Sequence, residues 1–76
     1  MKQAFLLINC DIGKEQQVIT NLKLVEGVKE AQATNGVYDV IAKLESKSER
    51  ELNETIRSKI LKIRPVHFVL ALQATS

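Results

Sequence analysis

The dipeptide Asn35-Gly36 lies between two runs of strand-like alternation, and it constrains the fold more than any other feature of the chain. Asn-Gly is the strongest short-range signal for a hairpin, because both central residues of a type I′ turn adopt positive φ. We therefore predict a hairpin over residues 27–45, with strands near 28–34 and 37–45 joined by a two-residue turn.

The two faces of this predicted hairpin differ in chemistry. In the register of a two-residue turn, one face pairs Ala33 with Tyr38, Ala31 with Val40 and Lys29 with Ala42. The other face pairs Gln32 with Asp39, Glu30 with Ile41 and Val28 with Lys43. The first face is largely apolar and suits packing against helices, whereas the second is mostly polar and holds an acid, Asp39, beside the turn.

A first helix is predicted over residues 14–24, before the hairpin. Its apolar residues share one stripe at helical spacing, namely Val18, Ile19, Leu22 and Val25. Asp11 is the candidate N-cap, and Gly27 is the candidate positive-φ residue after the helix.

A second helix is predicted after the hairpin. Ser48 and Glu51 have the spacing of a capping box, in which two free backbone donors are satisfied reciprocally. An apolar stripe then follows at Leu52, Ile56, Ile60 and Ile63. Pro65 ends the helix.

Strands are predicted at both ends of the chain, over residues 3–9 and 66–75, and both are apolar on two faces. The resulting order, β-α-β-β-α-β, is that of an α+β, ferredoxin-like fold in a single domain over residues 1–76. Right-handed crossovers place the first and third strands in the centre of a four-stranded antiparallel sheet, with the fourth strand beside the first and both helices on one face.

The second apolar face of the two terminal strands would then form one patch on the open side of the sheet. Such patches usually mark contact surfaces. We expect a homodimer through this open face, with Phe5, Leu7, Phe68, Leu70 and Leu72 as interface residues.

Composition excludes several classes of protein. The eleven basic and nine acidic residues are interleaved, so no nucleic-acid surface is predicted and we expect no direct DNA binding. The apolar run near the N-terminus is too short for a secretory signal or a membrane span. One cysteine, Cys10, fits a reducing compartment, and we expect a cytoplasmic location without membrane contact.

No catalytic constellation is recognisable, and we expect neither enzymatic activity, nor a metal site, nor a cofactor. His67 is the only histidine, and one His with one Cys does not make a metal site. The chain also lacks a phosphate-binding glycine motif.

The segments Val25–Ala31 and Thr34–Leu44 resemble the C-terminal ligand-binding domain of the Lrp/AsnC transcriptional regulators, also called the RAM domain. The resemblance extends over nearly the whole chain. Because Met1 stands almost directly before the first strand, the chain resembles the stand-alone version, without a helix-turn-helix.

The resemblance implies dimers, and rings of dimers, that bind an amino acid or similar effector between them near the hairpin turn. The matching ligand-binding positions are Gly36, Tyr38 and Asp39. Gly36 would allow close approach to the backbone, and Asp39 would accept hydrogen bonds from an α-ammonium group. The register above turns Tyr38 toward the helices, where it would support the turn.

The expected function is that of a small-molecule sensor and oligomerisation domain that modulates transcription, with full-length Lrp/AsnC regulators as possible partners. Two alternatives stay open. One is an ACT-like module, which binds amino acids on a similar fold and regulates an attached enzyme. The other is an oligomerisation module without a ligand.

Overall fold

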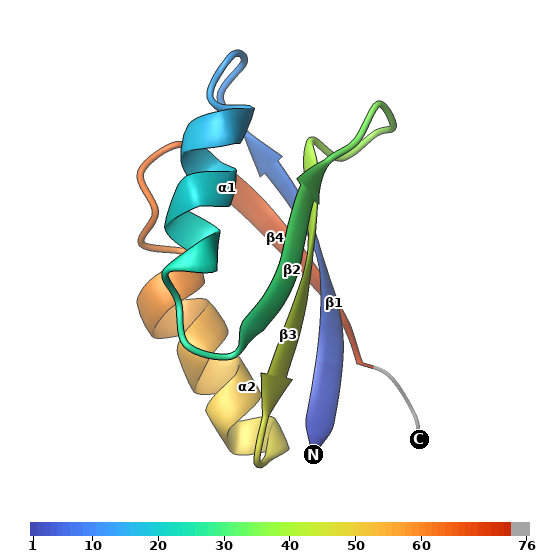
Figure 1. The fold of residues 1–76 in the computed structure, drawn as a ribbon, viewed down its shortest axis with the longest axis vertical. Helices are drawn as coiled ribbons and strands as arrows, with labels where there is room; N and C mark the ends of the chain where they lie inside the picture. The colour runs from blue at the N-terminus through green and yellow to red at the C-terminus, as the bar shows by residue number, and fades with distance from the viewer. Residues whose placement is uncertain (74–76) are drawn as a thin grey trace.

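The computed structural model describes residues 1–73 and confirms the β-α-β-β-α-β order (Figure 1). The elements are β1 (Lys2–Cys10), α1 (Glu15–Lys23), β2 (Val28–Ala33), β3 (Val40–Ser46), α2 (Glu49–Thr55), the π-helical segment η1 (Ile56–Ile60) and β4 (Val66–Gln73). The last two residues of the predicted fourth strand, 74 and 75, lie outside the described residues.

The four strands form one antiparallel sheet in the order β2-β3-β1-β4. Both helices lie on the same face of this sheet, and the other face is open (Figure 1). The predicted ferredoxin-like topology is therefore confirmed, with β1 and β3 in the centre.

The core lies between the sheet and the helices. Alternate residues of β1 point into it, and Leu6 and Ile8 are completely buried. The other buried apolar residues are Ala4, Cys10, Val18, Ile19, Leu22, Val40, Ala42, Leu44, Leu52 and Ile60. Strict alternation along β1 thus assigns its remaining side chains to the open face.

The start of α1 differs from the prediction, whereas its end agrees with it. The carboxylate of Asp11 does not cap the helix: the cap position is Lys14, without a side-chain cap, and the Asp11 carbonyl accepts a hydrogen bond from Lys14 N at 3.1 Å. The Asp11 carboxylate contacts His67 instead. After the helix, Gly27 has a φ of 96°, as predicted.

The start of α2 shows half of the predicted capping box. Ser48 Oγ accepts a hydrogen bond from Glu51 N at 3.1 Å, but the Glu51 carboxylate accepts one from Ser46 Oγ, also at 3.1 Å. The helix then widens into η1, where Leu61 N donates to Ile56 O at 2.9 Å. A π-turn was not predicted, because the apolar spacing of the segment is that of an ordinary helix.

The hairpin turn is longer than predicted, and the type I′ assignment is wrong. Neither Asn35 nor Gly36 has positive φ, and the strands are joined by residues 34–39. Thr34 N donates to Asp39 O at 3.0 Å, which closes the loop. The reason lies in β1, because Asp39 N donates to Ile8 O at 2.9 Å and so draws the end of the loop onto the neighbouring strand.

The register of the hairpin is consequently shifted by two residues. Ala31 pairs with Ala42 instead of Val40, and Gln32 pairs with Ile41 instead of Asp39. A shift of two residues preserves the face to which each strand residue points. The predicted division into an apolar helix-facing side and a more polar open side therefore persists for residues 30–33 and along β3. At the start of β2 the prediction is wrong, because a register irregularity between Val28 and Glu30 pairs Val28 with Leu44 and packs it against the core on the helix-facing side.

Two glycines allow a test of this backbone. At Gly27 a β-carbon would lie 2.6 Å from Glu45 O, on a residue with positive φ, whereas at Gly36 it would meet only Thr34 Oγ1, at 3.8 Å. We expect Gly27→Ala to destabilise the protein by about 1–3 kcal/mol and Gly36→Ala by less than about 0.5 kcal/mol, measured by urea denaturation. Equal effects of the two substitutions would contradict the described turn.

Candidate functional site

The open face of the sheet presents a continuous apolar surface. β1 and β4 pair Phe5 with Leu72 and Leu7 with Leu70, while Phe68 lies opposite Asn9. These five apolar residues, Phe5, Leu7, Phe68, Leu70 and Leu72, are called the open-face patch below. Paired residues of an antiparallel sheet share a face, so all five predicted interface residues lie on one surface.

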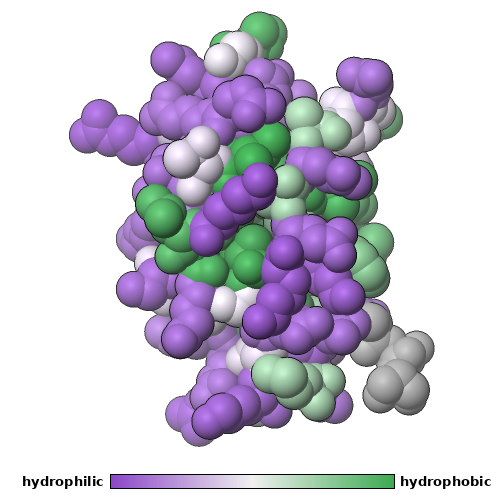
Figure 2. All heavy atoms as spheres, viewed as in Figure 1, coloured by the Kyte–Doolittle hydropathy of each residue, from purple (hydrophilic) through white to green (hydrophobic). Residues whose placement is uncertain are grey.

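The open-face patch is exposed although its residues are apolar. Phe5, Phe68 and Leu72 expose 43%, 48% and 49% of their surface, and Leu70 exposes 37%. Figure 2 shows the molecule from the side, where most of the surface is hydrophilic. Hydrophobic side chains appear near the centre of this view, toward the helices, and also at the right margin, away from them. Such an exposed apolar surface is typical of a contact site.

Polar residues border the patch on the β3 side. Gln3 Nε2 donates to Glu45 Oε2 at 3.1 Å, and Lys43 Nζ lies 3.9 Å from the same oxygen. Ile41 pairs with Leu7 and extends the apolar surface toward β2. An apolar centre with a polar border on one side is the usual anatomy of a protein interface.

Tyr38 lies on the open side of the sheet, not on the helix-facing side, which corrects the prediction. Its ring stacks on Phe68, with centroids 6.4 Å apart and planes inclined by 17°. Because the longer loop releases Tyr38 from β3, its side chain no longer follows the strand alternation. Tyr38 therefore joins the hairpin loop to the edge of the open-face patch.

Asp39 has a structural role that its position in the sequence does not reveal. Cys10 N donates to Asp39 Oδ2 at 2.8 Å, so one carboxylate oxygen accepts the backbone N–H at the end of β1. Within residues 1–73, no hydrogen bond reaches the other oxygen, Oδ1. Asp39 can thus hold the loop in place and still offer an acceptor to a ligand.

The three predicted ligand-binding residues share the hairpin loop but differ in their surroundings. Gly36 is exposed, and its N–H donates to Thr34 Oγ1 at 3.3 Å. Tyr38 turns to the open face and Asp39 to the end of β1. The loop brings them near one end of the sheet but does not converge their side chains on one enclosed cavity.

The neighbourhood of Asp39 contains the thiol of Cys10 and the contact of the Asp11 carboxylate with the His67 ring. Burial raises the pKa of the Cys10 thiol, and the carboxylates of Asp39, Glu15 and Asp11 raise it further. This keeps the thiol protonated and unreactive at neutral pH. Within the described residues no group of three or more His, Cys, Asp or Glu is placed to hold a metal ion.

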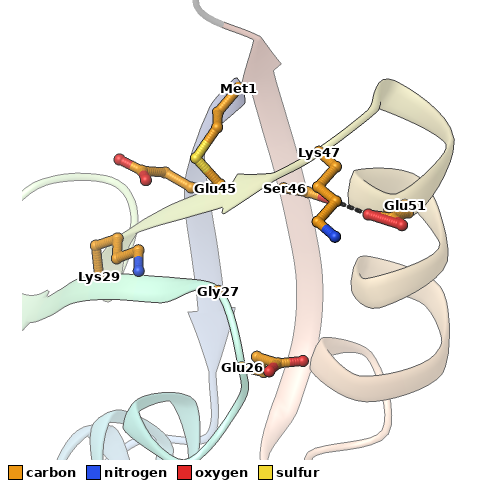
Figure 3. Close-up of a pocket in the computed structure, with 8 residues that line it drawn as sticks. All are labelled: Met1, Glu26, Gly27, Lys29, Glu45, Ser46, Lys47 and Glu51. Atoms are coloured by element: carbon orange, nitrogen blue, oxygen red, sulfur yellow. Dashed lines mark hydrogen bonds between the residues drawn. The ribbon is translucent and has the colours of Figure 1, made fainter.

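A separate cavity of about 380 Å³ lies at the opposite end of β2 and β3 (Figure 3). Its lining combines acids with bases: Met1, Glu26, Gly27, Lys29, Glu45, Ser46, Lys47 and Glu51. Gly27 O accepts a hydrogen bond from Glu45 N at 2.8 Å, which ties β3 to the start of β2. The mixed charges suit a small zwitterion, and the cavity contains none of the predicted site residues.

Sequence reasoning missed three of these features. The stacking of Tyr38 on Phe68, the Asp11–His67 pair and the bond from Cys10 to Asp39 each join residues at least 29 positions apart. An alternation pattern shows which face a residue occupies but not which distant loop it meets. For the stacked pair, the only available signal was the presence of two aromatic residues, Tyr38 near the hairpin turn and Phe68 on the last strand.

Together, the two-layer fold and its apolar open face define a ferredoxin-like domain with a prominent exposed apolar surface. The family model described as "Lrp/AsnC ligand binding domain" matches residues 3–72. The chain therefore belongs to the Lrp/AsnC ligand-binding domain family, as the hairpin motif predicted.

Relatives of two kinds share this domain. The "HTH-type transcriptional regulator FL11" of Pyrococcus abyssi is 40% identical over 50 residues, covering 66% of this chain and 33% of the regulator. The "Homocitrate synthase" of Sulfolobus acidocaldarius is 36% identical over 56 residues, covering 72% of this chain and 12% of the enzyme. The matched segment thus spans a third or less of these relatives.

Two solved structures have the same fold over 99–100% of this chain. The hypothetical protein PHS023 from Pyrococcus horikoshii has a TM-score of 0.93 and 33% identity, with 100% of this chain and 92% of that chain covered. The regulator NMB0573 from Neisseria meningitidis, solved as an L-Met complex, has a TM-score of 0.86 and 13% identity over 99% of this chain and 50% of its own. At that identity the second comparison shows the fold alone. No helix among residues 1–73 has the length and apolar character needed to cross a membrane.

The role of Asp39 in the fold is testable by two substitutions. Asp39→Ala leaves the N–H of Cys10 without its acceptor, and we expect a loss of about 1–3 kcal/mol in the free energy of unfolding. Asp39→Asn keeps an acceptor oxygen, so its loss is expected to be smaller. Urea denaturation followed by circular dichroism measures both, and two variants as stable as the parent protein would contradict this role.

Proposed function

We propose that this domain binds a small effector, an amino acid or a chemically similar molecule, and couples that binding to its own assembly on transcriptional regulators. The single observation that supports the proposal most is the open-face patch, which gives a member of a ligand-binding domain family a surface for self-association. Two copies joined by a two-fold axis would cover this patch with its own equivalent.

The size of the patch sets the strength of this association. Four of its residues are 37–49% exposed, so a dimer would bury a little under half of each of these side chains on both subunits. Full burial of one such side chain contributes about 1.5–3 kcal/mol, and the two subunits together would therefore gain roughly 5–10 kcal/mol. Association costs about 4–15 kcal/mol in lost freedom and ordering. The two ranges overlap, so the dimer would be reversible and responsive to further contacts, such as a ring of dimers or a full-length regulator.

An effector could shift this equilibrium between separate and assembled subunits. If it binds only between assembled subunits, it must shift the equilibrium toward assembly by linkage. The free Oδ1 of Asp39 can accept a hydrogen bond from an α-ammonium group, and Gly36 leaves open space beside the backbone. The L-Met complex of the structural neighbour NMB0573 supports an amino acid as the class of ligand.

A second candidate function is the regulation of an attached enzyme. The match to homocitrate synthase supports it, because 72% of this chain corresponds to only 12% of that enzyme. A segment that small is more consistent with a regulatory domain than with a catalytic one. In this role the same effector site and the same open-face patch would act on an enzyme instead of a DNA-binding domain.

The dimer is testable at the centre of the patch. Leu70→Asp places a charge where two copies would meet, and we expect it to convert the dimer to a monomer in size-exclusion chromatography at micromolar concentration. Lys29→Asp, on the exposed edge strand β2, is the control and should leave the dimer intact. A Leu70→Asp variant that elutes with the parent protein would exclude this face as the interface.

The effector is testable by a thermal-shift screen of the twenty amino acids. We expect at least one to raise the melting temperature, since a ligand at about 100 times its Kd stabilises by roughly 2.7 kcal/mol. The response should disappear in Asp39→Asn and persist in Lys29→Gln, which alters the cavity of Figure 3. The reverse pattern would place the ligand in that cavity, and no response to any amino acid would exclude this class of effector.

A further inference from the structure

A shallow groove runs along the helical side of the molecule, away from both the hairpin loop and the open-face patch. It lies between α1 and the segment that leads from η1 to β4, which pass side by side in Figure 1. Its volume is about 500 Å³, and its polar lining consists of Gln17, Asn21, Ser58, Lys59, Lys62 and Arg64. It is called the α1–η1 groove below.

The charge of this groove is of one sign. Lys59, Lys62 and Arg64 line it, and no carboxylate does. The ion pairs of lysine and arginine within residues 1–73 use other side chains, namely Lys43 and Arg57. Three cations on one short segment without an anionic partner repel each other, so a bound anion would relieve this repulsion.

The neutral lining residues suit the same kind of ligand. Gln17 and Asn21 are four residues apart on α1 and so lie on the same face of the helix, where their amide groups can donate hydrogen bonds. The wall opposite them is shaped by η1, whose π-turn is closed by the bond from Leu61 N to Ile56 O. π-Turns of this kind occur frequently at functional sites.

The backbone that holds the cations is fixed at several points. Ile63 N donates to Ile60 O at 3.1 Å, and Val66 N donates to Ile63 O at 3.0 Å. Pro65 O accepts a hydrogen bond from Asp11 N at 2.9 Å, which fastens the segment to the end of β1. Arg57, on the same π-turn, is paired with Glu54 at 2.6 Å and does not line the groove. A groove with a fixed backbone requires little ordering when a ligand binds.

We propose that the α1–η1 groove binds a short polyphosphate chain, either free or as part of a nucleoside triphosphate. Three cations offset most of the charge of a triphosphate, whereas a single carboxylate would leave two of them unpaired. Arg64 offers a planar fork of donors suited to phosphate oxygens, and the two lysines offer point charges.

The groove recognises the phosphates and not a base. The aromatic residues of the chain, Phe5, Tyr38 and Phe68, are absent from its lining, and Tyr38 and Phe68 are stacked on each other at the open side of the sheet. No ring is therefore available on which a nucleobase could stack. Tripolyphosphate, ATP and GTP should consequently bind with similar affinity.

Isothermal titration calorimetry of the whole chain with tripolyphosphate, ATP and GTP tests the proposal. The double variant Lys59→Gln/Lys62→Gln should weaken binding by about tenfold or more, since each loses a charge-assisted contact. The matched control, Lys29→Gln/Lys47→Gln, removes the same charge from the cavity of Figure 3 and should bind within about twofold of the parent protein. All four lysines are exposed, so both variants should fold.

Three results would overturn the proposal. Equal weakening by both variants would mean attraction by net charge alone, and no binding at millimolar ligand would exclude the site. Tighter binding of a duplex DNA, at equal phosphate concentration and with the same dependence on Lys59 and Lys62, would identify a nucleic-acid surface instead. If ATP bound far more tightly than tripolyphosphate, recognition of the base would replace recognition of the phosphates.

Discussion

The structure depends on one strand, β1, whose two faces are both apolar. Leu6 and Ile8 point toward the helices and are completely buried, while Phe5 and Leu7 point to the other side. A strand of this kind is stable when both of its faces are covered. The two helices cover one face. The other face, continued by β4, is the open-face patch, and its exposure is the physical reason to expect a second copy.

Much of the fold follows from patterns that are local in the sequence. The stripe of Val18, Ile19 and Leu22 placed α1 correctly, and the spacing of Ser48 and Glu51 placed the start of α2. The strand alternation separated the helix-facing from the open residues, and it did so although the hairpin register was wrong by two residues. Because side chains alternate with a period of two, that error left residues 30–33 and 40–45 on their predicted faces. Val28 and Tyr38, at the two ends of the hairpin strands, are the exceptions.

The hairpin loop and its surroundings could not be predicted in the same way. The loop is lengthened because Asp39 bonds to the end of β1 through its N–H and its carboxylate, a contact across 29 or more positions. The same rearrangement frees Tyr38 to stack on Phe68, and the contact of Asp11 with His67 replaces a helix cap. In each case a long-range partner competes with a local preference and wins, and no local pattern contains the identity of that partner.

We propose separate physical roles for three surfaces of the domain: an apolar face for assembly, a hairpin end for an effector, and a basic groove on the helical side for phosphates. The first is the central one, because the effector proposal requires assembled subunits. Intermolecular nuclear Overhauser effects in a sample that mixes labelled and unlabelled chains test it most directly. The two-fold dimer predicts such effects between the methyl groups of Leu7, Leu70 or Leu72 and the ring of Phe5 or Phe68 of a second copy. If intermolecular contacts were found only at α1 and α2, or not at all, the open face would not be the interface.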